Sequence, residues 1–194
     1  MTYKATSTPG SIVGSGSGSP ITVTGLTNGV AYTFIVNAVT GGGTGPNSSS
    51  SNSVTPIAIN QLWSWGNDAV GELGLGNTTT YSSPKQVGAL TNWLSIACGI
   101  YSAVSIKTDG TLWSWGYNNY GQLGQGNITN LSSPKQVGAL TNWSSVACGQ
   151  VYTVAIKTDG TLWSWGQNTS GQLGLGNITN YSSPKQVGAL TNWS

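Results

Sequence analysis

Very few side chains in this chain of 194 residues could catalyse a reaction or hold a metal ion. The sequence contains no His and no Arg, and its only acidic residues are Asp68, Glu72, Asp109 and Asp159. General acid–base catalysis and protein metal sites depend mostly on His, paired carboxylates or clustered Cys. We therefore predict that the chain is not an enzyme, and we expect no catalytic residue, no cofactor and no metal site.

The acidic residues have structural interpretations. Asp109 and Asp159 each lie in a Thr-Asp-Gly sequence, which is typical of a tight hairpin turn. Asp68 and Glu72 lie close together and are the one candidate for a carboxylate pair or a cation site. Calcium needs more oxygen ligands than this stretch offers, and the later copies of the stretch carry amides instead. Those amides are Asn118 and Gln122, then Asn168 and Gln172.

Two other residue patterns invite a chemical interpretation. The glycines of GELGLGN and GQLGLGN have the spacing G-x-x-G-x-G, but neither a helical pattern nor a Lys-Ser/Thr pair follows, as phosphate binding would require. They are better explained as glycines at a turn between strands, with Leu73, Leu123 and Leu173 inserted into the core. Cys98 and Cys148 occupy equivalent places in successive units, so we predict small buried residues rather than a disulfide or a metal site.

These patterns recur because the chain is a repeat. Residues 112–161 copy residues 62–111 almost letter for letter, and a third copy begins at 162 and runs to 194. All nine Trp fall inside this array, three to each unit. A period of 50 residues indicates an array of similar structural units, through which any function must be interpreted.

The charge pattern narrows the classes of partner. Only 5% of the residues are charged, against about 25% in ordinary soluble proteins. The six Lys are spread along the chain, whereas proteins that bind nucleic acids usually cluster their charge and use Arg. We expect no nucleic-acid binding. No apolar run is long enough to span a bilayer, so no membrane insertion is expected, and no signal peptide is visible at the first residues.

Each unit is predicted to contain four antiparallel strands. They lie at LWSW, at KQVGAL, around Ile96 or Val146, and in the segment that ends at Ile106 or Ile156. Four strands in 50 residues, joined by turns, describe one blade of a β-propeller. The fold class is therefore all-β, with a partial β-propeller of four-stranded blades that comprises two full repeats and a truncated third.

The tryptophans allow two interpretations. Trp63 and Trp65 are two residues apart on a predicted strand and so share one face, which a neighbouring blade would bury. We favour core packing for this pair in every unit, and the alternative is a stacking platform for sugars or bases. The third Trp of each unit follows Thr-Asn in a predicted loop, and its burial stays open.

The ordered motifs LWSWG, GQLGxGN, ACG and IKTDGT resemble the repeat of the regulator of chromosome condensation family. This resemblance covers residues 62–194 and implies a seven-bladed propeller. The chain departs from the family where those repeats carry His, since Ser102 and Tyr152 stand there. Kelch-type propellers have a similar period, but their units carry adjacent rather than spaced glycines.

Residues 1–56 differ from the array and contain no Trp. Alternating segments over 20–25 and 31–39 predict strands. The string PITVTGLTNGVAYTFIVNAV resembles the last strands of a fibronectin type III domain, with Leu26 and Tyr32 where that family has its tyrosine corner. The first strands of such a domain are missing, so we expect an incomplete β-sandwich, followed by a linker at 57–61.

Comparison of the units predicts where a partner would bind. The units differ mainly at 67–70 and its equivalents 117–120 and 167–170, and at 100–103 and its equivalent 150–153. Repeat proteins carry binding specificity in such loops, although drift in unconstrained loops is the simpler alternative. The predicted binding residues are Tyr117, Asn118, Asn119, Tyr120, Gln150, Val151, Tyr152 and Thr153.

Three functions compete. We favour a non-enzymatic interaction or adhesion scaffold that binds a protein or a glycan, in an extracellular, cell-surface or virion-attached protein. The family resemblance implies guanine-nucleotide exchange on a small GTPase as an alternative, or inhibition of a secreted enzyme. Because two units and part of a third do not close a ring, we also expect either a fragment of a larger protein or self-association through open propeller edges.

Overall fold

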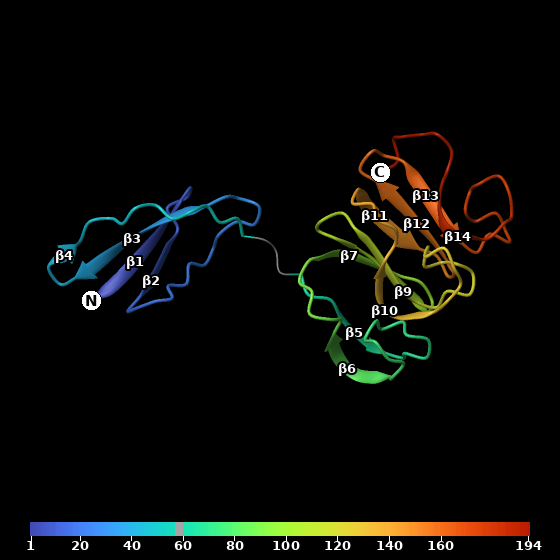
Figure 1. Ribbon diagram of the computed structural model, residues 1–194, viewed down its shortest axis with the longest axis horizontal. Coiled ribbons are helices and arrows are strands. Elements are labelled where there is room, and N and C mark those ends of the chain that lie inside the picture. The colour runs from blue at the N-terminus through green and yellow to red at the C-terminus, as the bar shows by residue number, and fades with distance from the viewer. Residues whose placement is uncertain (57–59) are drawn as a thin grey trace. The chain divides into compact units, whose positions relative to one another are not determined.

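The computed structural model describes residues 1–56 and 60–194, so the predicted linker at 57–61 lies partly outside the described residues. The chain divides into two compact units, Met1–Ala58 and Ile59–Ser194 (Figure 1). Each unit is built from β-strands, and no helix occurs in the described ranges. The predicted all-β class and the unclosed propeller of four-stranded blades are confirmed.

The first unit contains one antiparallel sheet with the strand order β2-β1-β3-β4. Its strands are β1 (Thr2–Thr8), β2 (Val13–Gly16), β3 (Thr33–Thr40) and β4 (Gly43–Thr44). Strand β3 pairs with β1 from Thr8↔Thr33 to Thr2↔Val39, and its last residue pairs with β4. The strand expected at 31–39 is therefore present as β3.

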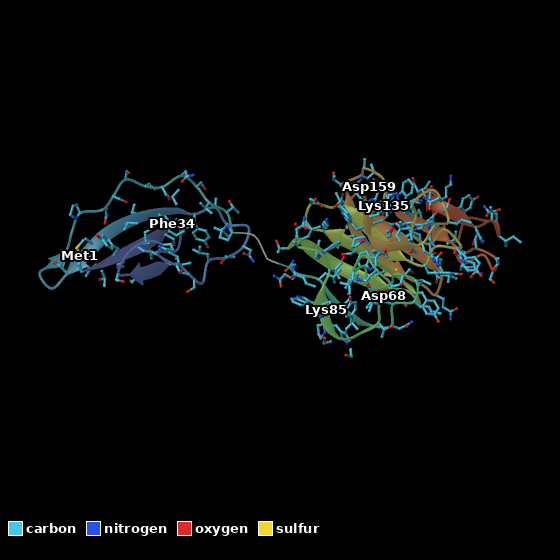
Figure 2. All side chains as sticks on the ribbon, turned by 60° about the horizontal axis from the view of Figure 1, so that its bottom comes forward. Met1, Phe34, Asp68, Lys85, Lys135 and Asp159 are labelled. Atoms are coloured by element: carbon cyan, nitrogen blue, oxygen red, sulfur yellow. The ribbon has the colours of Figure 1, made fainter. Side chains whose placement is uncertain are left out.

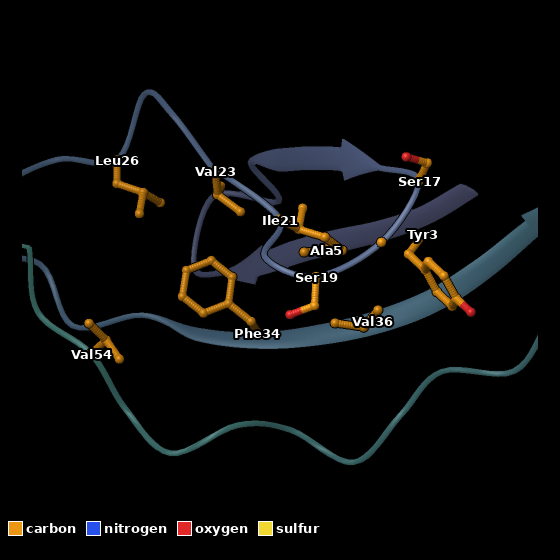
Figure 3. Close-up of a pocket in the computed structure, with 11 residues that line it drawn as sticks. Tyr3, Ala5, Ser17, Ser19, Ile21, Val23, Leu26, Phe34, Val36 and Val54 are labelled. Atoms are coloured by element: carbon orange, nitrogen blue, oxygen red, sulfur yellow. The ribbon is translucent and has the colours of Figure 1, made fainter. Parts of the chain in front are cut away.

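The strand expected at 20–25 is wrong, because these residues pair with no other strand. Their alternation has a different cause. Ile21 and Val23 line an apolar cavity of about 880 Å³ together with Ala5 of β1 and Phe34 and Val36 of β3 (Figure 3). The apolar side chains thus face the sheet, but the backbone forms no ladder of hydrogen bonds.

Tyr32 occupies the place expected for a tyrosine corner. Its side chain is buried, and its hydroxyl accepts a hydrogen bond of 3.1 Å from the backbone N–H of Thr27. The bond links the Tyr32 side chain to the backbone five residues upstream. It closes the turn that precedes β3.

The second compact unit, which holds the repeats, contains ten strands in three sheets within residues 60–194. Within residues 60–194 the first blade has two strands, β5 (Trp63–Gly66) and β6 (Tyr81–Gln86). The second blade consists of β7 (Trp93–Cys98), β8 (Ser102–Lys107), β9 (Leu112–Gly116) and β10 (Leu131–Gln136). The third blade consists of β11 (Trp143–Cys148), β12 (Tyr152–Lys157), β13 (Leu162–Gly166) and β14 (Tyr181–Gln186).

The blades are shifted against the sequence units. A sequence unit begins at LWSWG, which forms the third strand of a blade, so each complete blade joins the end of one unit to the start of the next. The strand expected at KQVGAL also differs: the strand is YSSPKQ, and the following residues turn at Gly88 with φ of 60°. That positive φ favours Gly and ends the strand.

Neighbouring blades interlock through one Trp and one glycine loop. The indole Nε1 of Trp115 donates a hydrogen bond of 3.0 Å to the carbonyl of Glu72 in the preceding blade. A β-carbon added at Gly74 would lie 2.7 Å from that Nε1, and Gly74 has a φ of +71°. The loop glycine is therefore required both for its backbone conformation and for the space it leaves.

The next pair of blades repeats this interlock. Trp165 Nε1 donates to the carbonyl of Gln122 at 2.9 Å, and a β-carbon at Gly124 would lie 2.8 Å from it. Leu73, Leu123 and Leu173 are buried, as expected for side chains that fill the core from these loops.

The third Trp of the first two units packs against the LWSW pair of the following unit, which lies in the same blade. The Trp93 ring meets the rings of Trp113 and Trp115 edge to face at 6.2 and 5.8 Å, and the ammonium of Lys107 lies 3.4 Å from the Trp113 ring centroid. The third blade repeats the cluster with Trp143, Trp163, Trp165 and Lys157. The loop tryptophans left open by the sequence, Trp93 and Trp143, are thus buried.

Core packing of the LWSW pair depends on the neighbouring blade. Trp115 is 2% exposed, whereas Trp63 and Trp65 are 47% and 58% exposed. The prediction of core packing is therefore wrong for Trp63 and Trp65, because no blade of the described chain covers the face of β5 that they occupy.

Asp68 occupies a position that the other units fill with an amide. Its side chain is buried, one carboxylate oxygen accepts the N–H of Leu73 at 2.9 Å, and the other has no hydrogen-bond partner among the described residues. At the equivalent position, Asn118 Nδ2 donates to the carbonyls of Asn127 and Thr129 at 3.0 Å. Burial raises the pKa of the Asp68 carboxyl, and the charge of nearby Glu72 raises it further.

We expect the substitution Trp115→Ala to lower the free energy of unfolding of the array by about 3–5 kcal/mol, because it removes a large core side chain and its bond to Glu72. The matched substitution Trp65→Ala should cost less than about 1 kcal/mol, since Trp65 is already exposed. Thermal and denaturant unfolding would measure both. Equal losses in the two variants would contradict the packing described here.

We expect Asp68→Asn to stabilise the array by about 1–3 kcal/mol at neutral pH, because it removes a buried charge and supplies an amide donor. The raised pKa means that the wild-type carboxyl destabilises the fold increasingly as the pH rises through that pKa. The gain should therefore shrink at about pH 3, where the carboxyl is protonated. Melting curves at both pH values would test this, and a wild-type protein stabilised by Ca²⁺ would instead indicate a cation site.

Candidate functional site

The turns and loops of three successive blades enclose an apolar groove. It has a volume of about 420 Å³ and lies within the unit formed by residues 60–194. We name it the tyrosine groove. Its lining residues are Asn67, Ala69, Val70, Ile100, Tyr101, Tyr117, Tyr120 and Val151.

Three tyrosines form a row along the groove. The rings of Tyr101 and Tyr117 meet edge to face at 6.4 Å, and those of Tyr117 and Tyr120 at 6.3 Å. Tyr101 is half exposed, and so is its neighbour Ile100. Edge-to-face contacts stabilise such a row, so it presents a preformed surface with few rotatable bonds.

Buried amides fix the loop that carries two of these tyrosines. The side-chain oxygen of Asn118 accepts the N–H of Leu123 at 2.9 Å, and its amide group donates to two backbone carbonyls further along the loop. Gln122 Oε1 accepts the N–H of Tyr120 at 3.0 Å. The backbone N–H of Tyr117 donates to the Tyr101 carbonyl at 2.8 Å, which joins this loop to the β7–β8 turn.

The β11–β12 turn closes the groove from the third blade. The N–H of Ile100 donates to the carbonyl of Gln150 at 3.2 Å, so the turns of neighbouring blades are in direct contact. Thr153 is buried and its hydroxyl donates to the carbonyl of Gln122 at 2.9 Å. The ring of Tyr152 lies over Gly149, where an added β-carbon would collide with it.

The structure separates the eight predicted binding residues into groups. Tyr117, Tyr120 and Val151 line the groove. Asn119 and Gln150 are exposed, whereas Tyr152 is half-buried. Asn118 and Thr153 are fully buried, and their side chains are engaged in hydrogen bonds within the scaffold.

Five lining residues are absent from the predicted set, and the sequence did contain a signal for them. They are Asn67, Ala69, Val70, Ile100 and Tyr101. All lie in the stretches 67–70 and 100–103, which differ between the units as strongly as those that were chosen. The sequence alone did not indicate that turns from three blades meet at one groove.

The remaining polar residues offer little chemistry. In the described part of the chain no three His, Cys, Asp or Glu residues lie close enough to hold a metal ion. Cys98 is exposed, which contradicts the predicted burial: it lies on β7, and among the described residues the first blade, which precedes β7 in the chain, has only the strands β5 and β6. Burial raises the pKa of the Cys148 thiol to about 11, so at neutral pH this thiol is protonated and a weak nucleophile.

Solved structures share the fold of the array. The similar structures include Prp20p from Saccharomyces cerevisiae, described with its binding to Gsp1p and histones, at 23% identity and a TM-score of 0.61. Human WBSCR16 is 24% identical, with a TM-score of 0.59. The alignments cover 71% of this chain but 36% and 37% of those chains, so the chain spans about a third of their length. A third match, at 23% identity with a TM-score of 0.60, is yeast RCC1 (Prp20) bound by Kap60, covering 71% of this chain and 35% of that one.

Two further comparisons complete these findings. No curated protein matches the chain. Across the described residues, no helix is long and apolar enough to cross a membrane.

The repeat itself matches a known family. The family model of the regulator of chromosome condensation (RCC1) repeat matches residues 60–106, 109–156 and 159–193, and a second model of this repeat matches 93–122 and 143–172. Together with the interlocked blades, these matches show that the chain belongs to the RCC1 repeat family.

Proposed function

We propose that the chain is a non-enzymatic protein-interaction scaffold that binds its partner in the tyrosine groove. One observation carries this proposal: the residues lining the groove are those in which otherwise near-identical units differ. In every unit a buried side chain accepts the N–H of the loop Leu and holds the backbone: Asp68, Asn118 or Asn168. Variation at the groove therefore changes the contact surface without changing the fold.

The groove indicates the chemistry of the partner. Its lining contains three tyrosines and four aliphatic residues but no charged side chain. Figure 2 shows Lys85 and Lys135 well apart on the array, so these lysines form no local basic patch. An uncharged segment with an aromatic or aliphatic side chain fits such a surface best, since a charged group would lose hydration without gaining an ionic partner. A glycan that stacks on the tyrosines is the alternative ligand.

The solved relatives support a binding role in general terms only. Prp20p is described as binding Gsp1p and histones, and in another structure it is bound by Kap60. At 23% identity that likeness concerns the fold, and the chain covers about a third of Prp20p. Guanine-nucleotide exchange therefore remains an alternative, as does inhibition of a secreted enzyme, and the groove favours neither.

We further propose that residues 1–56 are a partial fibronectin type III-like module and that the protein serves in adhesion at a cell surface or on a virion. The bond from Thr27 to Tyr32 and the antiparallel sheet β2-β1-β3-β4 support the first proposal. The joining of such a module to propeller repeats supports the second, because it is suited to the display of a binding surface.

The proposed function is tested by selecting ligands of the full chain from a phage-displayed peptide library and, separately, from a glycan array. The double substitution Tyr101→Ala and Tyr120→Ala should weaken a selected ligand by about 30-fold or more, as expected when an aromatic anchor is removed. Titration by calorimetry or interferometry would measure the affinity, and the melting temperature of the variant should change little.

Tyr181→Ala is the matched control, because Tyr181 lies on β14 and is not part of the groove lining. Its affinity for the same ligand should equal that of the wild type. The proposal fails if the groove variant binds normally while neutralisation of Lys85, Lys135 and Lys185 abolishes binding. Stimulated nucleotide release from a GTPase panel would favour the exchange function instead.

A further inference from the structure

The same kind of cavity occurs at both junctions between neighbouring blades. It has a volume of about 360 Å³ between the second and third blades and about 270 Å³ between the first and second. The larger cavity lies wholly between two four-stranded blades. We call the pair the interblade cavities. Their shared lining includes two Trp and one Leu at equivalent positions of the repeat: Trp143, Trp163 and Leu140 in the larger cavity, and Trp93, Trp113 and Leu90 in the smaller one.

A lysine ammonium is held against the tryptophans of each cavity. Lys157 lines the larger cavity and is only 7% exposed. Its Nζ lies 3.7 Å from the centroid of the Trp163 ring and 5.0 Å from that of Trp143. Lys107 has the same place beside the smaller cavity, with Nζ 3.4 and 4.7 Å from the equivalent rings. Such cation–π contacts orient the charge but give it no counterion.

The carboxylates that act on these lysines are held by other groups. Asp159 Oδ1 accepts the hydroxyl of Thr161 at 2.6 Å and its backbone N–H at 3.0 Å. Asp109 and Thr111 form the same two bonds in the preceding unit. Among the described residues that line either cavity, none is acidic. Each cavity therefore combines mainly apolar walls with one positive charge that those walls do not balance.

Such a cavity suits a singly charged acid with an apolar body. One ammonium balances one carboxylate, whereas a phosphomonoester brings about two negative charges and needs more donors than the lining offers. The side chain of an acidic peptide residue carries the right charge but has only a short methylene stem to pack on the indoles. A pyranose ring that bears a carboxylate carries the same charge and also presents C–H faces to Trp and Leu.

The repetition of the cavity indicates a polymer rather than a single acid. The two cavities occupy equivalent positions in successive units, so they recur along the array with the spacing of the blades. A polysaccharide with a uronic acid in every sugar unit also repeats its carboxylate at regular intervals. Binding of one sugar raises the effective concentration of the others at the second cavity and strengthens binding without any new contact.

We propose that the interblade cavities bind uronic-acid units of an acidic polysaccharide, one sugar to each cavity. The ammonium of Lys157 or Lys107 pairs with the sugar carboxylate, and the indoles and the Leu contact the pyranose ring. No residue of the tyrosine groove lines either cavity within the described chain. The proposal is therefore independent of the function proposed for that groove.

Titration of the full chain with polygalacturonate and alginate, followed by interferometry, tests the proposal. Their methyl esters are the matched probes, because esterification keeps the sugar rings and removes the charge. The wild type should bind at least one of the acids about tenfold or more tightly than its ester. The double substitution Lys107→Met and Lys157→Met should abolish this preference, since Met keeps an unbranched apolar side chain without the charge.

A second pair of variants leaves the packed lysines intact. Leu90 and Leu140 are 44% and 48% exposed, so Leu90→Glu and Leu140→Glu should fold normally while each adds a carboxylate to the lining of one cavity. Either change alone should weaken polymer binding by about 100-fold, because one of two linked sites is lost. Ile128→Glu makes the same charge change at an exposed residue outside both cavities and should bind as the wild type does.

Two further controls locate the site. Lys135→Met neutralises an exposed lysine outside both cavities and should leave the affinity unchanged. The double substitution Tyr101→Ala and Tyr120→Ala should also leave it unchanged, and a loss there would place the polysaccharide in the tyrosine groove instead.

Four other results would overturn the proposal. They are no binding of either acid at millimolar sugar concentration, equal affinity for acid and ester, equal affinity for poly-glutamate, and full affinity in both the Lys and the Leu variants. Equal binding of poly-glutamate would show that the lysines attract any polyanion and that the cavities do not recognise a sugar ring.

Discussion

The insertion of an indole into a glycine loop is the interaction on which the array depends. Trp115 and Trp165 reach a backbone carbonyl of the preceding blade only because Gly74 and Gly124 have no β-carbon and adopt positive φ. A blade sheet buries its apolar residues only against another blade, so this contact decides which faces become core. It also sets the spacing at which the outer loops of neighbouring blades meet.

The sequence predicted the period, the all-β class, the LWSW strands and the hairpins, because these follow from local patterns. It did not predict the phase of the blades, since a repeat of fixed length can be divided at any point. The exposure of Trp65 against the burial of Trp115, at identical local sequence, shows a second limit. Burial in a repeat protein depends on whether a neighbour is present, which no window of sequence reports.

The candidate site illustrates both the value and the limit of comparing units. The sequence differences between units identified Tyr117 and Tyr120, which line the groove. They also identified Asn118, whose side chain supports the loop by hydrogen bonds. Sequence variation by itself does not distinguish residues that form a binding surface from residues that hold the loop beneath it. Asp68 makes the same point, because its change from Asn alters a buried hydrogen-bond network rather than a contact surface. Only the positions of Ile100 and Tyr101 relative to the next blade show which variable residues meet.

The near identity of the two internal interfaces has a consequence for how such a gene can change. Because LWSWG and SSPKQ are the same in every unit, in-frame recombination between two copies would insert or delete whole units and leave every junction chemically unaltered. Array length could then vary between relatives without any compensating substitution in the core. The surface residues, by contrast, would be reshuffled as sets, so that new groove compositions arise from existing units rather than from single mutations.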